Sequence, residues 1–270
     1  MTKSVRVLVL LSVAVLLFSA TGCNKLRARD QLNKGVQSYK NARYEEAIEH
    51  FKNAVSFDPG LVNARLYLAT AYAQQYIPNA DNPENVRNAE QAIEQYKKVL
   101  EKDPNNINSV KGIAFLYLQM KKLDQAKEYY ERATKIDPND PEPYYSVAVI
   151  DWTQSYRPRM EQKARLGLGA AEPIKDKKAC DQLRIANLDK VEDGMRKLQK
   201  ALQLRPDYED AMAYMNLLYR EKADMECSDA TARTADLKAA DDWVDKTMAA
   251  RKAKEQKQQA SGIVLAPKNE

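Results

Sequence analysis

The sequence has little histidine, glycine and cysteine. Among 270 residues there are one histidine, eight glycines and three cysteines. The single histidine, His50, falls at an exposed position of a predicted helix, and no His/Cys cluster has the spacing of a metal site. No glycine-rich phosphate loop follows a predicted strand. We therefore predict a protein that is not an enzyme, with no catalytic residues, no metal and no cofactor.

A strong excess of charge of one sign is also missing. The formal net charge is +5, and removal of the N-terminal Lys3 and Arg6 lowers it to +3. A balance this weak gives no argument for binding of nucleic acid, which we exclude as a partner.

Long hydrophobic runs are limited to one segment, Val7–Phe18, which follows Lys3 and Arg6. It has the length of a signal peptide and is too short for a comfortable membrane span. The small residues that follow it and precede Cys23 resemble the bacterial lipobox, although Ala20 stands where leucine is common. The resemblance implies that residues 1–22 are a lipoprotein signal peptide and that Cys23 carries the lipid. An ordinary signal peptide, or an uncleaved anchor with a chance cysteine, is the alternative.

The resemblance also implies a location. Asn24 follows the cysteine, which in enteric-type bacteria favours release to the outer membrane. We expect a lipid-anchored protein of the bacterial cell envelope that faces the periplasm. Residues 23–27 would form a lipidated tether of at most about 18 Å when extended, because each extended residue spans about 3.5 Å.

Prolines give the sequence a period. Each of four prolines closes a helical pattern, and their spacings are 45, 34 and 68 residues: Pro59, Pro104, Pro138 and Pro206. A 34-residue period indicates an array of helix-turn-helix repeats. Such an array offers a surface on which another chain is held.

The third repeat carries a family resemblance. Small residues occupy the three positions at which its two helices would cross closely, Ala114, Ala126 and Ala133. Larger side chains would keep the two backbones apart. The pattern resembles the tetratricopeptide repeat, which implies an all-α, right-handed superhelix of about four to five repeats.

The same template divides the rest of the chain. It places the repeats at residues 28–61, 62–106, 107–140, 141–208 and 209–254, the last with a C-terminal capping helix, and it predicts a disordered tail at 255–270. The fourth repeat has an insertion at about 155–190, which we interpret as a protruding helical hairpin. Pro158 should break or kink the helix that leads into this insertion.

The resemblance implies where a partner would lie, because ligands of this family contact one face of the first helix in each repeat. The predicted groove residues are Leu32, Val36, Tyr39, Leu66, Lys111, Phe115, Leu118, Tyr145, Val149, Trp152, Leu217 and Arg220. Their aromatic members favour an extended or helical peptide with apolar side chains. The alternative is that these positions pack against neighbouring helices. The family's carboxylate clamp needs Lys and Asn where this chain has Leu32 and Val36, which argues against a reader of chaperone C-termini.

Two further cysteines need an explanation. Export would place Cys180 and Cys227 in an oxidising compartment, at the same end of neighbouring helices. If the two helices are aligned as neighbours, Cys180 lies about 9 Å along the helix axis from the level of Cys227, which is too far for a disulfide. Cys227 lies in a predicted turn, however, and this turn could bring the two residues together. We predict a disulfide between them, with two unpaired buried thiols as the alternative.

The inserted hairpin is rich in cations, which outnumber its acids by four: Arg157, Arg159, Lys163, Arg165, Lys175, Lys177 and Lys178 against Glu161, Glu172 and Asp176. A solvated face is the preferred interpretation, and contact with anionic lipid or an acidic partner is the alternative.

Together these features predict a membrane-anchored scaffold that binds envelope proteins or peptide segments in a cell-envelope assembly. The alternative is a periplasmic accessory protein of a transport system that binds a peptide or a small ligand.

Overall fold

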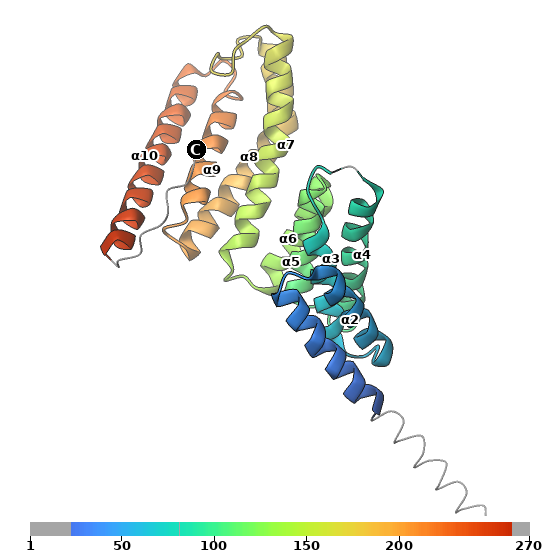
Figure 1. Ribbon diagram of the computed structural model, residues 1–270. Coiled ribbons are helices and arrows are strands. Elements are labelled where there is room, and N and C mark those ends of the chain that lie inside the picture. Colours follow the sequence, from blue (N-terminus) through green and yellow to red (C-terminus); the bar gives the residue numbers. More distant parts are fainter. Residues whose placement is uncertain (1–22, 81, 261–270) are drawn as a thin grey trace, which may run out of the picture. The chain divides into compact units, whose positions relative to one another are not determined.

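A computed structural model describes residues 23–80 and 82–260, and all regular structure in these ranges is helical (Figure 1). The chain forms two compact units: unit 1 ends at Tyr129 and unit 2 begins at Tyr130. Each unit is described by itself. The predicted signal peptide, residues 1–22, and residues 261–270 of the predicted tail lie outside the described residues.

Unit 1 is a series of antiparallel helices. A first helix spans residues 23–40, and the next helices are α2 (Tyr44–Phe57), α3 (Val62–Gln75), α4 (Pro83–Leu100), α5 (Ile107–Gln119) and the start of α6 (Leu123–Ile136). Each of α2, α3 and α4 packs against the helix that follows it. The predicted tether at 23–27 is helical rather than extended, so its five residues rise only about 7.5 Å.

Small residues let these helices approach each other, as the repeat pattern requires. Ala47, Ala69 and Ala114 have no exposed surface. A Cβ atom on Gly112 of α5 would lie 2.6 Å from the ring of Tyr96 in α4. The hydroxyl of Tyr96 is 3.2 Å from the Thr70 hydroxyl of α3, so this ring is fixed between three helices. The crossing leaves no room for a side chain at Gly112.

The insertion in the second repeat is a compact turn followed by a longer helix. Asn82 caps α4, since its side chain accepts a hydrogen bond from the backbone of Asn85 at 2.8 Å, and Pro83 is the first helical residue. The Asn85 side chain in turn bonds the backbone N–H and carbonyl of Ile77, each at 2.7 Å. A few polar bonds therefore order the extra residues.

Unit 2 consists of the end of α6 and four longer helices, α7 (Pro141–Arg165), α8 (Lys177–Leu204), α9 (Glu209–Ala223) and α10 (Ala230–Ala260). α7 packs on α8, α9 on α10, and α9 also contacts α7 and α8. The α7–α8 and α9–α10 connections lie at the same end of the unit, at the top of Figure 1. We call this end, residues 166–176 and 224–229, the tip.

Helix ends differ from two expectations. Of the predicted break or kink at Pro158, the break does not occur, because α7 runs through this residue. Its ring lies on an exposed face, and Asn187 of α8 donates to the carbonyl of Ser155, in the turn before the proline, at 3.2 Å. The predicted disordered tail begins too early, since residues 255–260 continue α10.

The two cysteines of unit 2 meet at the tip. Cys180 and Cys227 are joined in a disulfide with a Cα–Cα distance of 5.4 Å. The two residues lie closer than a helical path up to Cys227 would place them, because α9 ends at Ala223. The chain then turns back, with Cys227 in the left-handed backbone region at φ 45°.

The close crossing in unit 1 is testable by adding a side chain. Gly112→Val should lower the free energy of unfolding by about 1 to 3 kcal/mol, because the new methyl groups must displace the fixed Tyr96 ring. Thermal or denaturant unfolding measures the change. Asn108→Val adds the same side chain at an exposed position of α5 and should change stability by no more than about 0.5 kcal/mol. Equal effects of the two variants would contradict the crossing.

The disulfide can be tested by the mass and the thiol reactivity of the protein before and after reduction. The intact mass should rise by two hydrogen atoms on reduction, and neither Cys180 nor Cys227 should react with an alkylating reagent before reduction. Reduction should also lower stability by about 2 to 4 kcal/mol. Alkylation of both residues without reductant would show that the thiols are unpaired.

Candidate partner-binding surface

The predicted groove residues of the first helix are part of the core of unit 1. Leu32, Val36 and Tyr39 are half-buried and pack against a cluster that includes Ile48 and Phe51. Their side chains hold the first helix on α2. For Leu32, Val36 and Tyr39, packing against a neighbouring helix is therefore the interpretation that the structure supports.

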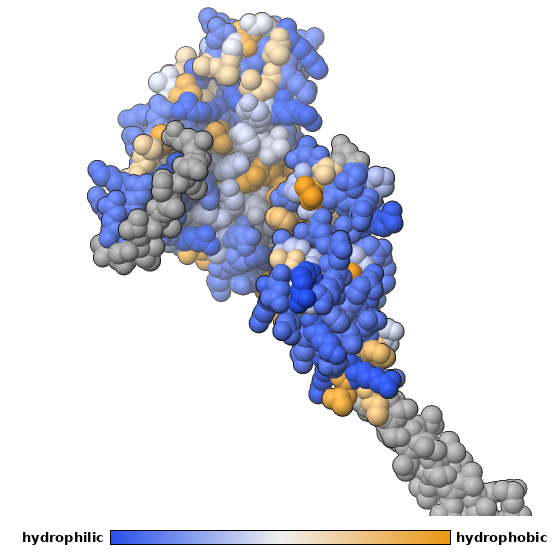
Figure 2. Space-filling model, viewed as in Figure 1, coloured by the Kyte–Doolittle hydropathy of each residue, from blue (hydrophilic) through white to orange (hydrophobic). Residues whose placement is uncertain are grey.

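One aromatic residue of unit 1 differs from this pattern. Leu66, Lys111 and Leu118 are half-buried, whereas Phe115 of α5 is 51% exposed. On the face shown in Figure 2 the surface is mostly hydrophilic, with small apolar patches. An exposed phenylalanine is an available anchor for a partner.

In unit 2 the structure brings aromatic residues from three segments into one line, which we call the aromatic row. It comprises Tyr208 from the α8–α9 turn, Tyr145, Trp152 and Tyr156 from α7, and Tyr214 from α9. Consecutive ring centroids are 5.0 Å apart (Tyr208–Tyr145), 5.5 Å (Tyr145–Tyr214), 5.4 Å (Tyr214–Trp152) and 4.9 Å (Trp152–Tyr156). Tyr145 and Trp152 are predicted groove residues, and Tyr214 connects them.

Three hydroxyls of the row, those of Tyr145, Tyr208 and Tyr214, stay protonated over the physiological range. Burial raises the pKa of Tyr145, Tyr208 and Tyr214 above the usual value, and the nearby carboxylate of Asp210 raises all three further. The row therefore offers apolar ring surface together with hydroxyl groups that can donate hydrogen bonds.

The other predicted groove residues of unit 2 flank the row. Val149 and Leu217 are half-buried. Arg220 donates to Asn216 at 2.8 Å and to Asp241 of α10 at 2.7 Å. The Asn216 side chain therefore helps to hold the arginine in place.

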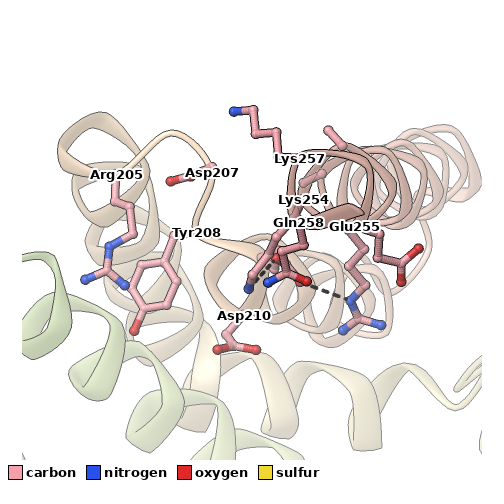
Figure 3. A pocket seen from close by; sticks show the side chains of 12 residues that line it. Arg205, Asp207, Tyr208, Asp210, Lys254, Glu255, Lys257 and Gln258 are labelled. Atoms are coloured by element: carbon pink, nitrogen blue, oxygen red, sulfur yellow. Dashed lines mark ion pairs between the residues drawn. The ribbon is translucent and has the colours of Figure 1, made fainter. Parts of the chain in front are cut away.

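One end of the row opens into a polar trough of about 940 Å³, formed by the α8–α9 turn and the end of α10 (Figure 3). Four cations and four anions line it, so their formal charges cancel. Glu209 forms ion pairs across it with Arg251 at 3.5 Å and Lys254 at 2.9 Å. A charge-balanced trough with internal ion pairs favours no ligand of either sign.

The other end of the row borders a cavity of about 380 Å³ at the tip, which we call the tip cavity. It lies between α7, the α7–α8 loop, α9 and α10. The residues that line it are Trp152, Tyr156, Arg159, Ala170, Ala171, Leu217, Arg220, Glu221, Asp224, Arg233 and Leu237.

Buried charges form the floor of this region. Asp224 pairs with Arg159 at 2.7 Å and with Lys163 at 2.6 Å, and Glu221 pairs with Arg159 at 2.9 Å. Arg159 is 8% exposed and Lys163 is fully buried. The prediction of a solvated cationic hairpin is wrong for these two residues, because they neutralise acids of α9 instead of facing water.

Sequence reasoning missed this cluster, but the sequence holds a signal for it. Arg159 and Lys163 are four residues apart and so share one face of α7. Glu221 and Asp224 are three residues apart at the end of α9, also on one face. A pair of cations on one helix and a pair of acids on a nearby helix could have been predicted to form ion pairs with each other.

The histidine also lies elsewhere than expected. His50 is half-buried rather than exposed, with Nδ1 2.8 Å from the side-chain oxygen of Gln31. Within residues 23–80 and 82–260 no group of three or more His, Cys, Asp or Glu is placed to hold a metal ion. No helix in these ranges has the length and apolar character needed to cross a membrane.

Comparisons with known proteins agree with the repeat pattern. Two family models described as tetratricopeptide repeat match residues 63–106 and 87–150, together about a third of the chain. The matched segments cover α3 to α6 and the first part of α7.

Curated relatives match over short parts of their own length. The chain is 24% identical over 67% of its length to the human protein O-mannosyl-transferase TMTC3, covering 19% of that protein. It is 30% identical over 43% of its length to the Hsp70-Hsp90 organizing protein of Triticum aestivum, covering 18% of it. The chain thus spans about a fifth of the length of these relatives.

Solved structures of MamA show the same fold. A crystal structure of MamA superposes with a TM-score of 0.58 at 14% identity, covering 89% of this chain and 98% of that one. MamA from Desulfovibrio magneticus RS-1, residues 41 to the end, gives 0.56 at 16% identity, covering 84% and 96%. The prediction of an all-α repeat fold is confirmed: this chain contains tetratricopeptide repeats.

Proposed function

We propose that this protein is a tetratricopeptide-repeat scaffold that binds a protein partner in a bacterial cell-envelope assembly. The aromatic row of unit 2 carries the proposal, together with the exposed Phe115 of unit 1. Five adjoining rings combine contact area with hydroxyl donors, and tyrosine and tryptophan are enriched among the residues that dominate binding energy. A peptide segment with apolar side chains and available acceptors suits this surface.

The partner is of a different kind from a chaperone C-terminus. Leu32 and Val36 stand where the family's carboxylate clamp has Lys and Asn, and both side chains are packed in the core of unit 1. They contribute no donor to a carboxylate. The similarity to an Hsp70-Hsp90 organizing protein therefore does not lead us to propose the same partners.

The scaffold would be anchored through a lipid on Cys23. This part of the proposal rests on the lipobox-like residues before Cys23 and on the exposure of that cysteine at the start of the first helix. Two or three acyl chains would hold the protein firmly at a membrane, whereas one chain gives marginal binding. Since residues 23–27 are helical, unit 1 would lie close to the lipid surface.

A second candidate function is favoured by the tip cavity. Its volume of about 380 Å³ falls in the range of small-molecule sites. This volume supports the alternative function that the sequence leaves open, an accessory protein of a transport system that binds a small ligand.

Phe115 gives the clean test of partner binding. Trp152→Ala would remove the packing of Tyr156 and Tyr214 as well as any partner contact, whereas the half-exposed ring of Phe115 carries less of the fold. Phe115→Ala should lower recovery of the partner at least about tenfold in pull-downs of the full chain from solubilised envelope.

Ile77→Ala is the matched control, because Ile77 is an equally apolar residue of unit 1, 64% exposed, and lies outside the predicted groove. It should leave recovery unchanged. Unchanged recovery with Phe115→Ala, at unchanged melting temperature, would exclude Phe115 from the partner surface. Absence of any stoichiometric partner of the unmodified chain would contradict the scaffold.

The anchor has a separate test. Cys23→Ala in the bacterial host should move the protein from the membrane fraction to the soluble fraction or leave an uncleaved precursor, because the acyl acceptor is lost. Mass spectrometry of the N-terminal peptide from the unmodified protein should show acylation of Cys23. A mature protein that starts elsewhere and carries no lipid would identify an ordinary signal peptide.

A further inference from the structure

The tip cavity is held in shape by the protein itself. Lys163 donates to the carbonyls of Ala170 and Glu172 at 2.7 and 2.8 Å, which fixes the α7–α8 loop that forms one wall. The Cys180–Cys227 disulfide fixes the end of α9 on α8. A ligand would therefore enter a site whose walls are already ordered, which reduces the entropy lost on binding.

Three residues that line the cavity carry buried donors without a hydrogen-bond acceptor in the described part of the chain, Trp152, Arg159 and Arg233. Nε of Arg159 still has an ion pair with Glu221 at 2.9 Å, whereas Arg233 reaches Asp224 only through Nη2, at 3.9 Å. Among the described residues, neither Nε1 of Trp152 nor Nε of Arg233 has a hydrogen-bond partner. Buried polar groups are almost always paired, so each such donor calls for an explanation. Trp152 and Arg233 share one cavity, and a ligand with acceptor oxygens would satisfy both.

The charge around the cavity also favours an anion. Four cations lie at or beside it, and three acids face them: Arg159, Lys163, Arg220 and Arg233 against Glu221, Asp224 and Asp241. Burial raises the pKa of Glu221 to about 7, even though Arg159 lowers it, so that acid is partly protonated at neutral pH. The balance is therefore positive.

The remaining walls are apolar. The rings of Trp152 and Tyr156 are stacked at 4.9 Å, and Leu217 and Leu237 also line the space. A flat or aliphatic body fits such walls better than a hydrated ion does, because it removes apolar surface from water.

We propose that the tip cavity binds a small organic carboxylate with an aromatic or apolar body. The carboxylate lies at the side of Arg233 and the Trp152 indole N–H, and the body lies against the stacked rings and the two leucines. This inference rests on the second candidate function and does not require the scaffold: a protein that fails to bind a partner through Phe115 can still bind the acid.

Phenylacetate is the probe, and Trp152 reports its binding. The chain has two tryptophans, so the full mature chain labelled with nitrogen-15 gives two indole signals, which Trp243→Phe assigns. Phenylacetate should shift the Trp152 indole signal saturably, with a Kd below about 1 mM for a ligand of this size. Trp243, which does not line the cavity, serves as internal control.

Matched ligands and variants test the role of charge. Neutral phenylacetamide should bind at least tenfold more weakly than phenylacetate, and cationic phenethylamine should not bind. Arg233→Gln should weaken phenylacetate at least tenfold, whereas Lys238→Gln, the same charge change at an exposed position of α10, should leave it unchanged.

Three results would overturn the proposal: no saturable shift of the Trp152 signal, equal binding of acid and amide, or equal effects of the two α10 variants. Phe115→Ala should leave phenylacetate binding unchanged. A failed pull-down with normal phenylacetate binding would count against the scaffold alone, and the reverse pattern would count against the cavity alone.

Discussion

The buried carboxylate of Asp224 holds the tip of unit 2 together. It lies at the end of α9 and pairs with two cations of α7, Arg159 at 2.7 Å and Lys163 at 2.6 Å. Buried ion pairs contribute little net stability, but removal of one partner leaves an uncompensated charge and costs about 3 to 5 kcal/mol. The cluster therefore acts as a constraint: α7 and α9 can pack only in the register that pairs these groups.

The shape of the tip follows from this constraint. Lys163, held by Asp224, bonds two carbonyls of the α7–α8 loop and so places Ala170 and Ala171 at the wall of the cavity. Arg159 is divided between Glu221 and Asp224, which keeps its guanidinium on the floor. A purely apolar tip could have been as stable, but it would have specified neither the loop nor the cavity.

Much of the fold could be predicted from the sequence because the repeat is a local pattern. Proline spacing and small residues at helix crossings report on neighbouring turns. The predicted fifth repeat begins at residue 209, where α9 starts. The failures involve long-range contacts. Pro158 stays inside α7, which Asn187 of α8 contacts in the preceding turn. Arg159 and Lys163 are buried because Asp224, 65 and 61 residues away, pairs with both.

The candidate surface shows the same division. Tyr145 and Trp152 could be assigned to one face from the repeat register, but not their connection through Tyr214, which depends on how α9 lies against α7. Phe115 and Leu32 are both predicted groove residues on the first helix of a repeat. Phe115 is half-exposed, whereas Leu32 packs on α2. Local pattern identifies the face of a helix, and the neighbouring helix decides which of its residues stay accessible.

Trp152 belongs both to the aromatic row and to the tip cavity, and this has a thermodynamic consequence. A ligand that changes the position of its indole changes the affinity of the row for a partner, and the partner must change the affinity for that ligand by the same factor. Tyr214 contacts Trp152 on the row side, and Tyr156 lines the cavity beside it. The stacked pair is thus one contact of unit 2 that is shared by the row and the tip cavity, beside Leu217 and Arg220, which also line the cavity.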